Sequence, residues 1–418
     1  MQDLQVHWWP IDRPIPYIRN SRKIPERAID KVAASIKEFG WRQPIVVDKD
    51  GVIICGHARL LAAKKLGLKQ VPVHVADNLT PAQVKAYRLM DNRSHDETDW
   101  DFDLLGPELE ELRALDFDLE LTGFDPHEID DFLADPELDD RANLVPDLPK
   151  NPVTVPGDVW LCGKHRVLCG DSTAPAAVSR LCGRTKPFLM ATDPPYGVEY
   201  DPMWREEAGL GQQRQTGKVA NDDQADWTAA YKLFSGDVAY VWHAGIHAGE
   251  VEAGLVNAGF EIRAQIIWSK QHFAMSRGHY HWQHEPCWYA VRKGRRSNWL
   301  GDRTQSTIWA VQNLNPMGGD RNEKATGHGT QKPVELMRRP IVNHTKRGDV
   351  VYDPFLGSGT TMMAAELTER ICYAIDIDPR YVDVAVVRWQ DLTGKAATLE
   401  GDGRTFEQIK SQRLGVAA

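Results

Sequence analysis

Asp193-Pro194-Pro195-Tyr196 is a chemically suggestive tetrad, because it follows an apolar run at 188–192 with the pattern of a buried strand. Two adjacent prolines fix the backbone φ angle and remove two N–H donors, so the end of this strand is rigid. It carries a carboxylate acceptor and an aromatic face. This pair suits an exocyclic amino group on a planar ring, since a carboxylate and a carbonyl can accept its two protons while the tyrosine stacks. The tetrad also fits an ordinary strand-end turn.

A second motif, Asp353-Pro-Phe-Leu-Gly-Ser-Gly359, stands between an apolar run at 350–352 and a helical pattern. Its glycines permit a tight strand-to-helix turn and the close approach of a ligand to the backbone, and the helix start offers N–H groups. Asp376 ends the next apolar run, where a carboxylate in such folds holds ribose hydroxyls. The third glycine of the dinucleotide pattern is missing.

Alternating apolar and helical patterns must position these motifs. The apolar runs of the second half of the chain lie at residues 166–170, 188–192, 238–242, 262–268, 350–352 and 371–375. They predict an α/β domain with a mostly parallel, doubly wound sheet and active residues at the strand ends. Upstream, a helix after Pro25, a hairpin turn at 49–51 and a helix closed by Gly67 predict a small α+β unit that ends near residue 98.

Composition and charge indicate a water-soluble globular protein that can bind a polyanion. The 418 residues have a formal net charge of −9 and are 42% hydrophobic. Residues 101–140 hold 16 Asp+Glu and one basic residue, Arg113, which leaves the remainder of the chain at +6. No apolar run is long enough to span a membrane. We therefore expect no membrane contact.

The six cysteines are scattered and form no CxxC pair, which favours reduced thiols in a cytoplasm. Cys162, His165 and Cys169 lack a second ligand pair at zinc-finger spacing, so we interpret them as structural and expect no metal.

Together, the two chemical motifs resemble those of the β-class S-adenosylmethionine-dependent amino (N6-adenine/N4-cytosine) DNA methyltransferases. In that family the Asp-Pro-Pro-Tyr tetrad is catalytic, the Asp-x-Phe-x-Gly-x-Gly turn binds the cofactor, and the tetrad comes first, as it does here. Further matching segments are Gly170-Asp171, Trp268-Ser-Lys270, His284-Glu285-Pro286 and Thr330-Gln331-Lys332-Pro333, although Gly329 replaces a commoner proline. The resemblance spans roughly residues 153–395.

The resemblance implies site-specific methyl transfer from S-adenosyl-L-methionine to a base that is flipped out of duplex DNA. The implied catalytic residues are Asp193, Pro194, Pro195 and Tyr196. The implied cofactor-binding residues are Asp171, Thr330, Gln331, Lys332, Asp353, Phe355, Gly357, Ser358, Gly359, Thr360 and Asp376.

Aspartate at the first tetrad position goes mostly with adenine N6 in this family, so Asp193 favours an adenine-specific DNA methyltransferase. Three alternatives stay open. The enzyme could act on cytosine N4, the substrate could be RNA, or the chain could be a non-catalytic ParB-type DNA-binding protein with a relict methyltransferase fold.

For DNA contact, the densest basic region opens the interval 292–325, where the family commonly carries its target-recognition segment. The expected DNA-binding residues are Arg292, Lys293, Arg295, Arg296 and Arg303. Without that context, the same cluster also fits a solvated surface.

The N-terminal unit resembles the ParB/sulfiredoxin-like domain over residues 8–98. In relatives that bind nucleotides, a Gly-x-x-Arg turn cradles phosphate; the matching positions are Gly56 and Arg59, with Arg22 as a candidate partner. His57-Ala58 departs from the pattern of the partition proteins, and Cys55 is not at the sulfiredoxin position. This favours a ParB-like fold without nucleotide turnover, with DNA or nucleotide binding as the alternative.

The expected domains are therefore the ParB-like domain, an acidic helical connector and linker at 99–150, and a Rossmann-like methyltransferase domain at 151–396. Double-stranded DNA is the expected partner. The sequence leaves open whether the chain forms a homodimer and whether a cognate restriction endonuclease accompanies it.

Overall fold

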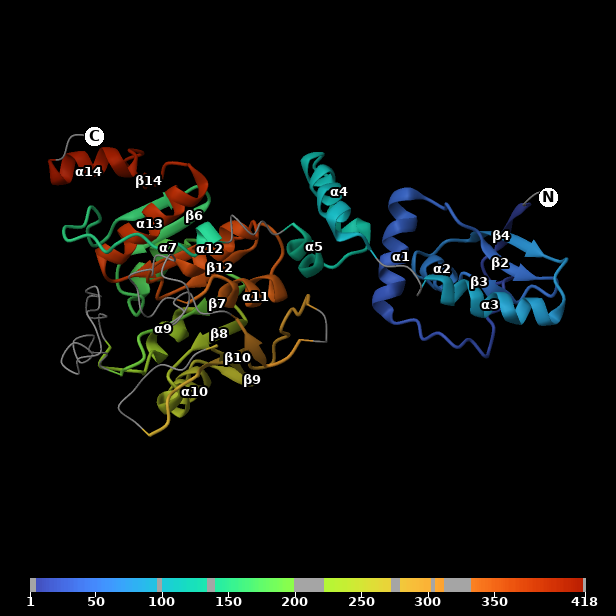
Figure 1. The fold of residues 1–418 in the computed structure, drawn as a ribbon, viewed down its shortest axis with the longest axis horizontal. Coiled ribbons are helices and arrows are strands. Elements are labelled where there is room, and N and C mark those ends of the chain that lie inside the picture. Colours follow the sequence, from blue (N-terminus) through green and yellow to red (C-terminus); the bar gives the residue numbers. More distant parts are fainter. Residues whose placement is uncertain are drawn as a thin grey trace. The chain divides into compact units, whose positions relative to one another are not determined.

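The computed structural model describes residues 5–95, 100–133, 140–198, 222–271, 279–301, 305–311 and 332–415. The chain forms two compact units, Met1–Leu133 and Ala134–Ala418. The boundary falls inside the stretch that was expected to connect two domains. Each unit contains a β-sheet with helices packed beside it (Figure 1).

The first unit contains a four-stranded sheet covered by helices. Across the sheet the strands are β1 (Val6–Pro10), β4 (Gln70–Ala76), β2 (Ile45–Asp48) and β3 (Ile53–Cys55). Strands β2 and β4 are parallel, and the other neighbours are antiparallel. The helices are α1 (Glu26–Phe39), α2 (His57–Lys65) and α3 (Pro81–His95). The small α+β unit expected from the sequence is confirmed.

The acidic segment forms helices in this same unit: α4 (Phe102–Ala114), η1 (Leu119–Thr122) and α5 (Pro126–Phe132). Leucines spaced along the segment bury a small apolar cluster that includes Leu105, Leu109 and Leu119. Asp125 pairs with Arg27 and, at 2.9 Å, with Lys31, both on α1. The segment is therefore docked on α1 by charge, and Phe117 stacks on Phe39 at the end of α1 with ring centroids 6.3 Å apart.

The second unit is built on a ten-stranded sheet. Its order is β11 (Ile308–Ala310), β9 (Phe260–Ser269), β10 (His284–Arg292), β8 (Val238–Trp242), β7 (Leu189–Thr192), β12 (Val350–Asp353), β13 (Ile371–Asp376), β6 (His165–Cys169), β5 (Val159–Cys162) and β14 (Thr398–Leu399). The five strands from β8 to β6 are all parallel. Strand β10 runs antiparallel between β8 and β9. The doubly wound sheet expected from the sequence is confirmed.

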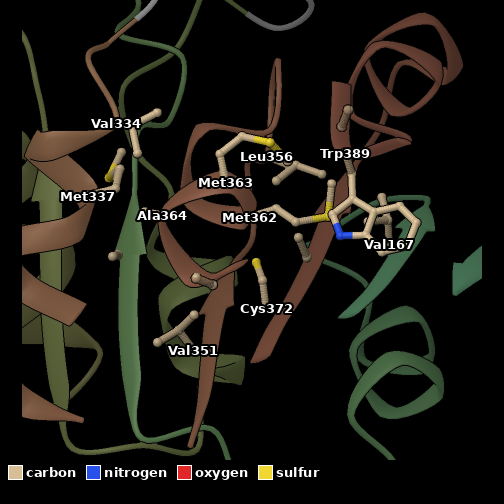
Figure 2. Packing of buried hydrophobic residues seen from close by; sticks show 14 of the residues in the cluster. Val167, Val334, Met337, Val351, Leu356, Met362, Met363, Ala364, Cys372 and Trp389 are labelled. Carbon is tan, nitrogen blue, oxygen red and sulfur yellow. The ribbon is translucent and has the colours of Figure 1, made fainter. Parts of the chain in front are cut away.

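Helices cover both faces of this sheet. They are α7 (Pro175–Cys182), α9 (Thr228–Leu233), α10 (Ala248–Asn257), α11 (Glu335–His344), α12 (Thr360–Leu367), α13 (Pro379–Thr393) and α14 (Phe406–Leu414). Because side chains alternate along a strand, Val351 joins the core with α11, α12 and α13, whereas Tyr352 joins the opposite core with α7 and α9. Figure 2 shows Met362 and Met363 of α12 packed in the first core, near Leu356 and Cys372.

Candidate active site

The predicted chemical motifs meet at one edge of the parallel sheet. Strand β7 runs into Asp193, and its parallel neighbour β12 ends at Asp353. Strand β13 ends at Asp376, whose carbonyl accepts a 2.8 Å hydrogen bond from the N–H of Gly170 after β6. Since the carboxyl ends of parallel strands lie together, the tetrad, the glycine turn and the Gly170-Asp171 pair share this edge.

The tetrad is held in place by side chains that sequence reasoning did not single out. Asp222 accepts hydrogen bonds of 3.1 Å from the backbone N–H groups of both Tyr196 and Gly197. The indole N–H of Trp227 donates to the carbonyl of Pro195 at 3.0 Å. A proline pair cannot join a strand ladder, so these external partners fix its position.

Lys332 lies against the tetrad. Its Nζ atom is 2.7 Å from Asp193 Oδ2 and 2.6 Å from the Tyr196 hydroxyl oxygen, and the lysine side chain is only 3% exposed. It is also 2.9 Å from Glu285 Oε2, while Lys270 pairs with the other oxygen of Glu285. The motif around Lys332 predicts a cofactor contact; in the described structure its ammonium lies against Asp193, Tyr196 and Glu285.

These contacts set the protonation of the cluster. Burial raises the pKa of Asp193, with Glu285 adding to the effect and Lys332 opposing it. Burial alone would raise the pKa of Glu285, but Lys332 and Lys270 lower it to about 2. Burial would likewise lower the pKa of Lys332, but Asp193 and Glu285 together raise it. The negative charges of two carboxylates are thus compensated by the positive charges of two ammonium groups.

One acceptor of the cluster has no partner within the described part of the chain. Oδ1 of Asp193 is covered from solvent and accepts no hydrogen bond there, although the side chain as a whole is 27% exposed. A buried carboxylate oxygen without a donor is costly, so it marks a position where a ligand donor would be favourable.

The glycine turn is organised by the strand-end aspartates. Asp353 Oδ1 accepts from the hydroxyl of Thr192 at 2.6 Å and from the N–H of Phe355 at 3.0 Å. Asp376 Oδ2 accepts from the N–H of Gly357 at 2.7 Å. Burial raises the pKa of Asp353 to about 6 and that of Asp376 to about 7.

The turn itself leaves room for a ligand. Gly357 has φ of 54°, and a Cβ atom added there would meet nothing within 4 Å. Gly359 caps α12 with φ of 91°, and a Cβ there would stand 3.0 Å from Cβ of Ala385. On the inner side, the guanidinium of Arg388 donates to the carbonyl of Ser358 at 2.9 Å. The turn is therefore packed against α13 at Ser358 and Gly359, and it leaves open space at Gly357.

Of the remaining predicted cofactor residues, three lie in the described part of the chain and two lie outside it. Phe355 packs edge-on against Trp227, with ring centroids 4.7 Å apart, and Thr360 is buried at the start of α12. Asp171 is exposed and accepts from the N–H of Thr173 at 2.8 Å. Thr330 and Gln331 lie outside the described residues.

Arg292, the first residue of the predicted basic cluster, lies away from the tetrad. Arg292 ends the antiparallel strand β10, beside the start of β8, and so lies at the sheet edge opposite Asp193. Its guanidinium donates to the carbonyls of Gly236, Ala258 and Phe234, at 2.8, 3.2 and 2.6 Å. This side chain is thus committed to the fold, which is the physical reason against a DNA contact at Arg292.

The neighbouring Lys293, Arg295 and Arg296 are exposed near the same edge, and Arg303 lies outside the described residues. No helix in the described ranges is long and apolar enough to cross a membrane. No grouping of His, Cys, Asp and Glu suited to a metal ion occurs among the residues described.

In the first unit, Gly56 caps α2 with φ of 101°. Arg59 donates to the carbonyl of Pro44 at 3.2 Å and to the side chain of Gln43, while Arg22 donates to the carbonyl of Asn92 at 2.9 Å. These three predicted phosphate positions are accordingly engaged with the fold in this structure.

Comparison with known proteins assigns a family to each segment. A DNA methylase model (N6_N4_Mtase) matches residues 189–387, which include the tetrad and the glycine turn. A ParB N-terminal domain model matches residues 11–92, and a ParB-methyltransferase HTH domain model matches residues 103–156. The HTH match covers the acidic helices α4 and α5, which lie in the segment predicted from the sequence to be a helical connector.

Among similar proteins, the Type II methyltransferase M2.MboI of Moraxella bovis is 25% identical over 227 residues, covering 49% of this chain and 81% of that protein. The ParB-like nuclease domain-containing protein YnaK of Escherichia coli (strain K12) is 37% identical over 82 residues, covering 20% of this chain and 94% of YnaK. The crystal structure of the M1.HpyAVI–SAM complex is 22% identical with a TM-score of 0.39, covering 53% of this chain and 98% of the other.

The matched methylase family uses S-adenosyl-L-methionine as its methyl donor. The residues present fit such a cofactor, because open space above Gly357 adjoins the strand-end carboxylate of Asp376. The chain is a DNA methyltransferase of the N6/N4 DNA methylase family that carries a ParB N-terminal domain and a ParB-methyltransferase HTH domain ahead of its methylase domain.

Proposed function

We propose that this chain methylates adenine N6 in duplex DNA at a specific sequence, with S-adenosyl-L-methionine as the donor. The observation that carries the proposal is Asp193 Oδ1, a covered acceptor without a partner among the described residues, beside the aromatic ring of Tyr196. An exocyclic amino group on a planar base supplies both the missing donor and a surface for stacking. The aspartate at the first position of the tetrad supports adenine over cytosine.

The glycine turn and its flanking carboxylates would hold the cofactor. Gly357 and Ser358 would line it at the backbone, Asp376 would accept from the ribose hydroxyls, and Asp171 would meet the adenine. When bound, S-adenosyl-L-methionine would supply an activated methyl carbon; the N–C bond would form as the S–C bond breaks to a thioether, and one amino proton would be released to the carboxylate of Asp193 or to water.

The tetrad would act on the target base. The amino nitrogen of adenine is a poor nucleophile because its lone pair is delocalised into the ring. Hydrogen bonds from its protons to Asp193 Oδ1 and to the carbonyl of Pro194 would draw the nitrogen toward tetrahedral geometry and aim the lone pair. Stacking on Tyr196 would offset part of the cost of flipping the base, which is a few kcal/mol.

The test is methyl transfer from tritiated S-adenosyl-L-methionine to duplex DNA by the purified chain. We expect incorporation into duplex DNA and none from the Asp193→Ala variant. Methyl incorporation into matched RNA that equals or exceeds incorporation into duplex DNA would support RNA as the substrate. No incorporation into either, from a chain that still binds the donor, would support the non-catalytic DNA-binding alternative. Digestion to nucleosides separates N6-methyladenine from N4-methylcytosine.

A further inference from the structure

We propose that Lys332 is a positioning residue for methyl transfer, which holds Oδ2 of Asp193 so that Oδ1 faces the target amino group. The inference rests on the proposed function and deepens it. It also differs from the cofactor contact that the sequence motif around Lys332 had suggested.

The hydrogen-bond count supports this role. A lysine ammonium has three N–H donors, and Nζ of Lys332 has three oxygen partners: Asp193 Oδ2 at 2.7 Å, Tyr196 Oη at 2.6 Å and Glu285 Oε2 at 2.9 Å. Two of these contacts are hydrogen bonds and the third is an ion pair, so the ammonium is surrounded by partners from the cluster. With Oδ2 of Asp193 occupied, Oδ1 is the oxygen available to a substrate.

The same contacts orient the aromatic ring. The hydroxyl of Tyr196 accepts from Lys332 and donates to Glu285 Oε2 at 3.2 Å, so both of its hydrogen-bonding directions are defined. Glu285 is fixed in turn by Lys270, the residue that follows β9. Lys332 thus links the carboxylate and the stacking ring of the tetrad to a second ion pair, and it sets their relative position.

Charge gives Lys332 a second effect. Without its ammonium, Asp193 and Glu285 would face each other with only Lys270 for compensation. Two buried carboxylates at close range cannot both stay ionised, so one takes a proton. The pKa of Asp193 is already raised by burial, so Asp193 is the group that would become protonated. A protonated Asp193 is a poorer acceptor for the amino protons.

Other titratable groups contribute smaller charges to this cluster. They are His243 after β8 and Cys287 of β10, which face Lys332, and Asp353 of β12, which faces Asp193. Burial keeps His243 and Cys287 neutral near pH 7, because it lowers the pKa of the histidine and raises that of the thiol. The ammonium of Lys332 is therefore the main charge that opposes protonation of Asp193.

The experiment compares Lys332→Met and Lys332→Arg with Lys410→Met, a matched control at a surface lysine 3.3 Å from Glu407. Calorimetry measures the affinity for S-adenosyl-L-methionine, and single-turnover transfer to duplex DNA is measured across pH. For Lys332→Met we expect donor affinity within threefold of the parent chain and a transfer rate at least about 100-fold lower. Its half-maximal rate should move to higher pH. Lys332→Arg should recover part of the rate, and the control should match the parent.

Two results would overturn the inference. A donor affinity reduced tenfold or more, with an unchanged rate in the saturated complex, would make Lys332 a cofactor ligand. An unchanged rate and pH profile would remove the role altogether. If circular dichroism shows that Lys332→Met is unfolded, Lys332→Arg decides, since it keeps the positive charge but places its donors differently: transfer must be slower than in the parent chain while donor affinity is unchanged. Failure of the proposed function is distinct, because the parent chain itself would then transfer no methyl group.

Discussion

Gly357 and Gly359 stand two residues apart in the same turn, yet alanine at each position should have different consequences. Both have positive φ, 54° and 91°, so an alanine at either would be strained. A methyl group at Gly357 would project into open space, where we expect the cofactor. A methyl group at Gly359 would stand 3.0 Å from Cβ and 3.2 Å from Cα of Ala385 in α13.

The magnitudes follow from this geometry. Left-handed backbone costs a non-glycine residue about 1–2 kcal/mol, and this term applies to both variants. Overpacking in a well-packed core adds about 1–3 kcal/mol, and this term applies only to Gly359→Ala, because the opposing Cα is backbone and cannot swing away. We therefore expect a loss of about 1–2 kcal/mol in the free energy of unfolding for Gly357→Ala and about 2–5 kcal/mol for Gly359→Ala.

Urea unfolding of the full chain without cofactor measures both values, on the transition that S-adenosyl-L-methionine shifts in the parent chain. Donor affinity should show a separate loss for Gly357→Ala, at least tenfold, because its methyl group would occupy the ligand space. Equal losses of stability in the two variants would refute the packing argument. Full donor affinity in Gly357→Ala would refute the placement of the cofactor.

Three further predictions concern the tetrad support, the strand-end carboxylate and the basic cluster. Asp222→Ala removes two backbone hydrogen bonds from the tetrad loop, including that of Tyr196, and should slow transfer at least about tenfold with donor affinity unchanged, measured by single turnover and calorimetry. The pKa of Asp376 is raised to about 7 in the folded chain, so the stability that its protonated form contributes is complete below about pH 4 and is lost as pH rises through 7. The urea midpoint of the parent chain should therefore fall between pH 5 and pH 8, and that of Asp376→Asn should fall less over the same range. Arg292→Met should cost about 1.5–3 kcal/mol of stability but leave DNA affinity at fixed salt within about twofold of the parent chain, as filter binding measures, because its guanidinium is bound to backbone carbonyls.

Local patterns were sufficient for the fold and for the shared sheet edge. Apolar runs such as 188–192 and 371–375 are strands, and the rule that parallel strands end together brings Asp193, Asp353 and Asp376 to one edge. Both inferences need only short-range periodicity and a topological rule, which are readable in a single sequence.

Contacts between distant residues were not readable in the same way. Lys332 follows Asp193 by 139 residues, and Asp222 follows Tyr196 by 26, so no spacing rule joins them. The position of Arg292 could not be predicted either, because the local density of basic residues does not tell at which edge of the sheet an antiparallel strand ends. Glu285 belongs to a local sequence motif, but its position between Lys270 and Lys332 depends on contacts with residues distant in the chain.

The central claim is that the tetrad directs a methyl group to adenine N6, and sequencing of host DNA with detection of modified bases tests it most directly. We expect N6-methyladenine at the copies of one short sequence in cells that express the chain, and none at those sites in cells that express Asp193→Ala at equal levels. N4-methylcytosine at a fixed sequence would contradict the assignment of the base, and N6-methyladenine that persists with Asp193→Ala would contradict the assigned role of the carboxylate.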